Sequence, residues 1–72
     1  MTARGRVLDL LDHARGEWVT GVALAGVGGY RFGARIHELR QDGWVIERRT
    51  DPRSAVDQYR LVPQDEQLRI AL

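Results

Sequence analysis

The residues of this sequence that could do chemistry are above all arginines. All eleven basic residues are arginine, against ten acidic residues, for a formal net charge of +1. The positive excess falls on residues 31–53, where six arginines meet four acidic residues. A guanidinium group suits phosphate and the edge of guanine. The segment is therefore the candidate for nucleic-acid recognition, although a genome rich in G and C, whose codons favour arginine, explains the arginine content equally well.

Groups suited to catalysis are scarce. The chain contains no cysteine, which excludes a cysteine nucleophile, a thiolate metal site and a disulfide. His13 and His37 lie far apart in sequence, and no pair of carboxylates accompanies either at metal-ligand spacing. The glycines of residues 26–29 lack the flanking strand and the Lys-Ser/Thr of a phosphate-binding loop. We expect a protein that is not an enzyme and takes no metal, cofactor or small-molecule substrate.

Length and composition restrict the architecture that positions these groups. Seventy-two residues allow one small domain, which buries only about 60% of the surface of its unfolded chain. The hydrophobic fraction of 43% is that of a folded domain. No apolar run approaches the roughly 18 residues of a membrane span, and the polar N-terminus lacks a signal-peptide hydrophobic region. We expect a soluble, cytoplasmic protein with no membrane partner.

Three segments have the apolar spacing of helices, namely residues 2–15, 21–27 and 30–42. Thr2 and Thr20 are the expected N-caps of the first two. In the second segment, Val22, Ala23 and Val27 should face inward. Three glycines within residues 26–29 place a turn between the second and third helices, because glycine is unfavourable inside a helix and permits a positive φ.

Strand composition occurs in residues 17–19, 44–49 and 56–62. Residues 50–54 have turn chemistry, so the last two segments predict a β-hairpin. Trp18 and Trp44 should pack close together at its base. The order of elements predicts an α+β fold, a winged helix-turn-helix over residues 1–63. Residues 64–72 form a tail that either makes a short C-terminal helix or frays.

The third helix and the hairpin also carry a resemblance. Together with earlier residues, they are similar to small winged helix-turn-helix DNA-binding proteins, especially the short versions of bacteriophages and prophages. The residues that carry the likeness are Val19-Thr20, Val22-Ala23-Leu24, Gly28, Arg31-Phe32-Gly33-Ala34-Arg35-Ile36-His37-Glu38-Leu39-Arg40, Gly43-Trp44-Val45-Ile46 and Tyr59-Arg60-Leu61. The likeness spans roughly residues 6–62 and implies binding to double-stranded DNA. Two features depart from it. Gly28 and Gly29 suggest a looser turn than is usual in the family, and Asp51 beside Arg53 weakens the case for a phosphate contact there.

The third helix would present the recognition face. With Phe32, Ile36 and Leu39 buried, a helical wheel turns four residues outward with Gly33 beside them: Tyr30, Ala34, His37 and Gln41. Arg31 could take a guanine through paired hydrogen bonds. Arg35 lies nearer the core and would hold a phosphate or pair with Glu38. In the hairpin, Arg48 or Arg49 and Arg53 would reach the DNA backbone or the minor groove.

Each of these residues also has an interpretation without DNA binding. Arg31 and Arg35 would equally suit a solvated helix face with ordinary ion pairs, and His37 a plain surface histidine. Two functions therefore remain open. One is a sequence-specific DNA-binding protein, a transcriptional regulator or a recombination or architectural accessory factor of a phage or mobile element. The other is a protein-interaction module of the same fold without DNA binding.

The tail adds a prediction about assembly. Leu68 and Leu72 lie four residues apart, with Ile70 and Ala71 between them. A helix this short is unstable alone in water. The tail should therefore lie against the first helix of its own chain or against its copy in a second chain, the latter giving a homodimer.

Overall fold

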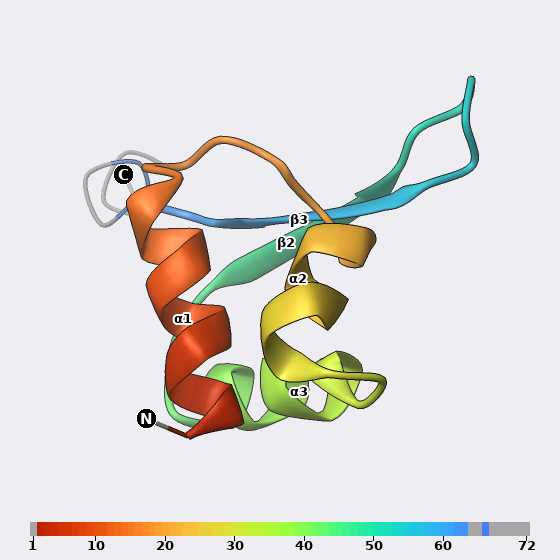
Figure 1. Cartoon of the computed structure of the whole chain (residues 1–72). Coiled ribbons are helices and arrows are strands. Elements are labelled where there is room, and N and C mark those ends of the chain that lie inside the picture. The colour runs from red at the N-terminus through yellow and green to blue at the C-terminus, as the bar shows by residue number, and fades with distance from the viewer. Residues whose placement is uncertain (1, 64–65, 67–72) are drawn as a thin grey trace.

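The computed structural model describes residues 2–63 and residue 66 (Figure 1). Its elements are α1 (Ala3–His13), β1 (Val19–Thr20), α2 (Gly21–Gly28), α3 (Phe32–Gln41), β2 (Ile46–Thr50) and β3 (Asp57–Leu61). The helices cover one face of a three-stranded antiparallel sheet of order β1-β3-β2 (Figure 1). We call the β2–β3 hairpin, with its loop of residues 51–56, the wing. The predicted α+β winged helix-turn-helix fold is confirmed. The predicted C-terminal helix lies outside the described residues.

Both predicted threonine caps are present. The Thr2 hydroxyl accepts a hydrogen bond from the backbone N–H of Gly5 at 3.1 Å, and the Thr20 hydroxyl accepts one from Ala23 at 3.1 Å. Each hydroxyl satisfies one of the N–H groups that the first turn of a helix leaves unpaired. The starts of α1 and α2 are therefore set by local chemistry, in agreement with the sequence.

The turn between α2 and α3 depends on two glycines with different roles. Gly28 ends α2, and a Cβ at this position would lie 2.7 Å from Cγ2 of Val7 in α1. Gly29 has a φ of +77°, which favours glycine. Gly28 thus lets the two helices approach closely, and Gly29 turns the chain. Only residues 29–31 separate the helices, so the turn is short; whether it is looser than is usual in the family stays a prediction.

The hydrophobic core lies between the helices and the sheet. Its fully buried members come from all three helices: Val7, Leu11, Leu24, Ile36 and Leu39. The predicted inward face of α2 is wrong in part, because Val22 is 76% exposed and Ala23 is also exposed, whereas Val27 packs against the core. The sequence of α2, GVALAGVG, is apolar on every side. Its composition therefore carries no directional signal, and packing against the rest of the domain selects Leu24.

The two tryptophans occupy opposite faces of the sheet, so the prediction that they pack together is wrong. Val19 and Tyr59 pair across β1 and β3 and are buried under the helices. Alternation along the strand places Trp18 on the outer face, where the guanidinium carbon of Arg49 lies 4.2 Å from its ring centroid. Trp44 lies on the helical side, beside a hollow that also contacts α1. A short β1 with alternating sides explains the separation.

Candidate nucleic-acid interface

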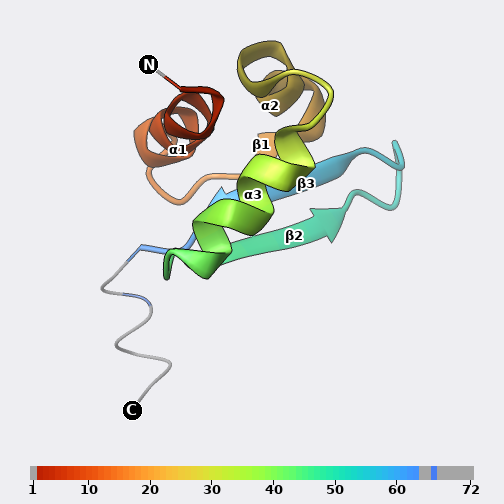
Figure 2. The same cartoon turned by 90° about the horizontal axis from the view of Figure 1, so that it is seen from below.

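The outer side of α3 is free of the rest of the domain (Figure 2). Ile36 and Leu39 are buried and hold the other side of the helix against the core. The residues predicted to face outward are all exposed: Tyr30, Gly33, Ala34, His37 and Gln41. The middle of this surface is small, because Gly33 and Ala34 occupy it. A helix face of this shape can lie closely against the floor of a major groove.

Arg31 stands at the N-terminal end of this face. It occupies the N-cap position of α3, is exposed, and its guanidinium has no hydrogen-bond or ion-pair partner within residues 2–63 and 66. Tyr30, next to it, is fully exposed. The N-terminal residues of a recognition helix are those that meet base edges, so the local geometry suits the predicted role of Arg31.

Arg35 and Arg40 are used by the protein itself. Arg35 Nη2 lies 2.9 Å from Glu38 Oε1, one of the two alternatives that the sequence left open for this residue. Its Nε is buried without a hydrogen-bond partner in the described part of the chain. Arg40 donates from Nε and Nη2 to the carbonyl oxygen of Ile46, at 3.2 and 2.8 Å. Arg40 thereby ties the C-terminal half of α3 to the beginning of β2.

Arg48 and Arg49 are neighbours in β2 that point to opposite faces of the sheet. Arg48 lies opposite Tyr59, whose ring contacts Phe32 of α3 edge-on at 5.7 Å between centroids. Arg48 is therefore on the helical face. Arg49 lies opposite Gln58 on the outer face, where it stacks on Trp18. Only Arg48 of this pair shares a face with α3.

A carboxylate holds the Arg48 guanidinium. Arg48 Nη2 donates to Asp57 Oδ2 at 3.0 Å, and the Thr50 hydroxyl donates to Asp57 Oδ1 at 2.8 Å. The hydrogen bonds from Thr50 and then Arg48 keep the pKa of Asp57 below its ordinary value. The hydrogen bond and the charge of Asp57 in turn raise the pKa of Arg48. The side chain of Arg48 is still 56% exposed, so it remains accessible from solvent.

Arg53 lies at the tip of the wing. Its backbone N–H donates to Asp51 Oδ1 at 2.9 Å, while its side chain is exposed and has no partner among the residues described. The wing loop projects on the side of the domain where α3 begins (Figure 2). The Asp51 carboxylate caps the turn of the loop. The guanidinium group of Arg53 therefore remains available.

Sequence reasoning missed the polar cluster on the outer face of the sheet. Arg60, whose side chain is 15% exposed, donates to Glu47 Oε1 at 2.9 Å and to Glu66 Oε1 at 2.6 Å. These hydrogen bonds, first that of Glu66 and then that of Glu47, raise the pKa of Arg60. Trp18 lies against the same guanidinium, at 5.6 Å. No local pattern predicts this cluster, because its members come from β2, from β3, from the residue before β1 and from the segment after β3.

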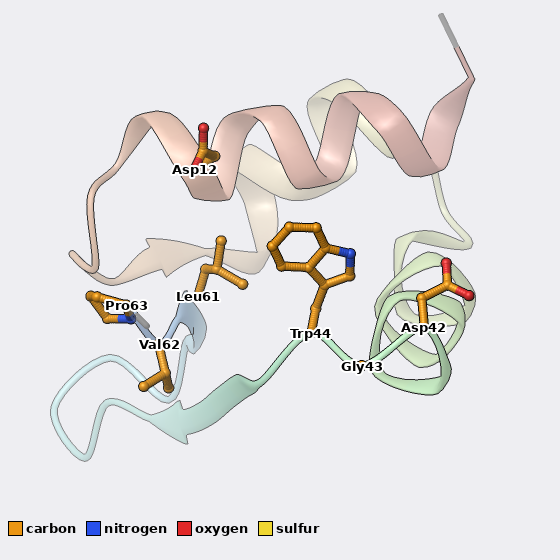
Figure 3. A pocket seen from close by; sticks show the side chains of 7 residues that line it. All are labelled: Asp12, Asp42, Gly43, Trp44, Leu61, Val62 and Pro63. Atoms are coloured by element: carbon orange, nitrogen blue, oxygen red, sulfur yellow. The ribbon is translucent and has the colours of Figure 1, made fainter. Parts of the chain in front are cut away.

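A separate hollow lies at the edge of the domain away from the wing loop. The Trp44 ring stands at its centre, 44% exposed, between α1 and the end of α3 (Figure 3). Asp12 and Asp42 flank the ring, and Asp42 is paired with Arg4 at 3.0 Å. Among the described residues, no group of three or more metal-ligating side chains occurs. No helix in that same part of the chain combines the length and the apolar character that crossing a membrane requires.

A tight helix-turn-helix followed by a hairpin wing defines a winged helix-turn-helix protein. The comparison with protein families agrees, since the model of the winged helix-turn-helix domain matches residues 4–63. The chain therefore belongs to the winged helix-turn-helix domain family, whose fold indicates DNA binding. No curated protein and no solved structure matches it.

Proposed function

We propose that this protein binds double-stranded DNA sequence-specifically, with α3 in the major groove and the wing against the backbone or minor groove. The observation that carries the proposal is the placement of two uncommitted guanidinium groups. Arg31 stands at the start of α3 and Arg53 at the tip of the wing, and neither has a side-chain partner within the described residues. Phosphate oxygens and base edges are the ligands that such groups take in DNA.

The proposed contacts fall into two kinds, those to base edges and those to the DNA backbone. Arg31, with Tyr30 and Ala34, meets base edges, because these residues belong to the N-terminal part of the recognition helix. His37 and Gln41 follow on the same exposed face. Arg48 and Arg53 hold the backbone beside α3. We leave Arg35 and Arg49 out of the proposed DNA contacts: Arg35 pairs with Glu38 and its side chain is less exposed than that of Arg48. Arg49 lies on the sheet face opposite α3.

The proposed cellular role rests on the resemblance to small winged helix-turn-helix proteins of phages and prophages. A single domain covers one half-site, and regulators gain affinity by pairing on two half-sites about one helical turn apart. We place the protein among transcriptional regulators or recombination and architectural accessory factors of phages or mobile elements, acting in the cytoplasm. Pairing through residues 64–72 remains part of the proposal; of this segment, the structure describes residue 66 alone.

The test is a duplex titration at two salt concentrations, preceded by selection of a preferred site from a random pool. We expect affinity for the selected site to fall steeply between about 50 and 200 mM salt, because phosphate contacts release counterions. Arg15→Gln is the matched control: Arg15 is exposed and lacks a side-chain partner in the described chain, but lies in the turn after α1 and not on α3 or the wing. Arg53→Ala should weaken binding and Arg15→Gln should not.

A protein-interaction module is the second candidate, and two observations favour it. The outer side of α2 is uncharged and exposes Val22, and Trp44 is half-exposed in its hollow. Monomeric proteins keep large apolar surfaces covered unless they serve binding. If the wild-type protein binds no duplex at low salt, the DNA proposal is overturned and this second candidate takes its place.

A further inference from the structure

The wing has a root at which the sheet changes from three strands to two. β1 pairs with β3 only through Val19↔Tyr59 and Thr20↔Gln58. The pairing of β2 with β3 continues further, through Arg49↔Gln58 to Thr50↔Asp57. The level of Arg49 and Gln58 is thus the last one supported by a third strand. An isolated two-stranded hairpin is marginally stable in water, so the direction of the wing tip depends on how this level is held.

Arg49 holds this level from the outer face. Its Nε donates to Gln58 Oε1 at 2.6 Å, and its guanidinium carbon lies 4.2 Å from the centroid of the Trp18 ring. A guanidinium group over a ring at this distance makes a cation–π contact. It joins β2 to the chain just before β1, across the whole width of the sheet. Arg49 therefore links the two edge strands at the point where the wing leaves the sheet.

The Trp18 ring that supports Arg49 is itself held in place by a second arginine, Arg60. Arg60 lies against the same ring at 5.6 Å and is held by Glu47 and Glu66. Arg60 Nη1 also donates to the carbonyl oxygen of Gly16 at 3.4 Å, two residues before Trp18. Trp18 is therefore enclosed by a network that reaches the end of α1. Motion of the wing root would have to disturb this network.

We infer that Arg49 is a positioning residue that acts through Trp18 to aim the wing tip, and not a DNA contact. The inference rests on the proposed DNA binding and deepens it. Arg49 lies on the sheet face opposite α3, so a duplex that contacts α3 meets the side of Arg48 instead. The stack on Trp18 keeps the wing, and with it Arg53, at the height where the backbone of the bound duplex passes.

The binding test compares Arg49→Met and Trp18→Leu, each alone and combined, on a selected duplex of about two helical turns. Each single variant should lose about two- to fivefold in affinity, the factor that an exposed cation–π contact supplies. The double variant should lose no more DNA affinity than the single variant with the larger loss, because both substitutions remove the same contact. Arg53→Ala should reduce DNA affinity much less in the Arg49→Met or Trp18→Leu background than in the wild type. Arg31→Ala should cost the same in all of them, which shows that α3 is intact.

A direct contact gives the opposite pattern. Trp18→Leu would then leave affinity unchanged, while Arg49→Met would weaken it and reduce the salt slope by about one unit. Additive losses in the double variant would likewise overturn the inference. If the wild type binds no duplex at all, the proposed function fails, and the position of the wing is then decided by the following measurement.

That measurement needs no DNA. The chain contains no cysteine, so Ser54→Cys accepts a single nitroxide spin label on the exposed wing loop. Trp18→Leu and Arg49→Met should each increase the mobility of this label relative to the labelled protein. Arg15→Gln, which removes an arginine elsewhere, should leave the spectrum unchanged. Equal mobility in all four proteins would overturn the inference, whatever the outcome with DNA.

Discussion

The recognition helix and the wing present arginine in different ways. On α3, the exposed face carries small and uncharged residues, and Arg31 stands free at its start. In the wing, the arginines at the root are bound on both faces of the sheet, Arg48 by Asp57 and Arg49 by Trp18, and only Arg53 at the tip is free. Packing against the core already fixes the direction of α3 and of its exposed side chains. The two-stranded wing is only marginally stable by itself, so side-chain contacts at its root are needed to fix its direction.

The largest expected effect tests which side of α3 is buried. Ile36→Asp should unfold the domain, because Ile36 is 2% exposed and its replacement would bury an unpartnered carboxylate. The cost is comparable to the whole stability of a small domain, about 5 kcal/mol or more. Ala34→Asp, on the opposite side of the same helix, should melt like the wild type but lose DNA affinity. A cooperative, near-wild-type thermal melt of Ile36→Asp would show that the buried face of α3 has been misidentified.

The next effect concerns the packing that places α3. Gly28→Ala should destabilise the domain by about 1–3 kcal/mol, because the added Cβ overlaps a stiff, fully buried Val7. Gly26→Ala is the matched control, since a Cβ there meets no atom within 4 Å. It should stabilise α2 by about 0.5–1 kcal/mol. Chemical denaturation of both variants measures the difference, and equal stabilities would contradict the close contact between α1 and α2.

A third comparison separates the helix from the wing in DNA binding. Arg31→Ala should lower discrimination between the selected site and a mismatched site by about 1–3 kcal/mol. Arg53→Ala should weaken binding to all sequences alike and reduce the salt slope by about one unit. Equal, sequence-independent losses for both variants would make Arg31 a phosphate contact rather than a reader of bases.

The smallest effect is a pH dependence confined to one face of the wing root. Because the pKa of Asp57 is lowered in the folded protein, its hydrogen bonds stabilise the wing above the ordinary aspartate pKa of about 3.9. This stability is lost as the pH falls through the lowered value. NMR signals of Arg48 and Thr50 should shift in that range, whereas the contact of Arg49 with Gln58 should persist. Asp57→Asn should abolish this pH-dependent shift. A shift that persists in the variant would come from the titration of another group.

Much of the fold was predictable because its signals are local. Thr2 and Thr20 cap the helices within one turn, and Gly29 sits where the chain needs a positive φ. The four- and three-residue spacing of Phe32, Ile36 and Leu39 identified the buried side of α3 and hence its free side. Each of these features depends on residues only a few positions apart, so the sequence by itself determined the helices, the turn, the hairpin and the exposed face of α3.

The tertiary structure alone decided how the remaining side chains are used. α2 has no polar side, so contact with α1 selected Leu24 over Val22. The faces taken by Arg48 and Arg49 follow from the register of β2 on β3, and a shift of one residue would exchange them. Trp18, which precedes β1, meets Arg49 of β2 because both of these strands pair with β3. Pairing between residues distant in sequence sets these contacts, and no local pattern encodes it.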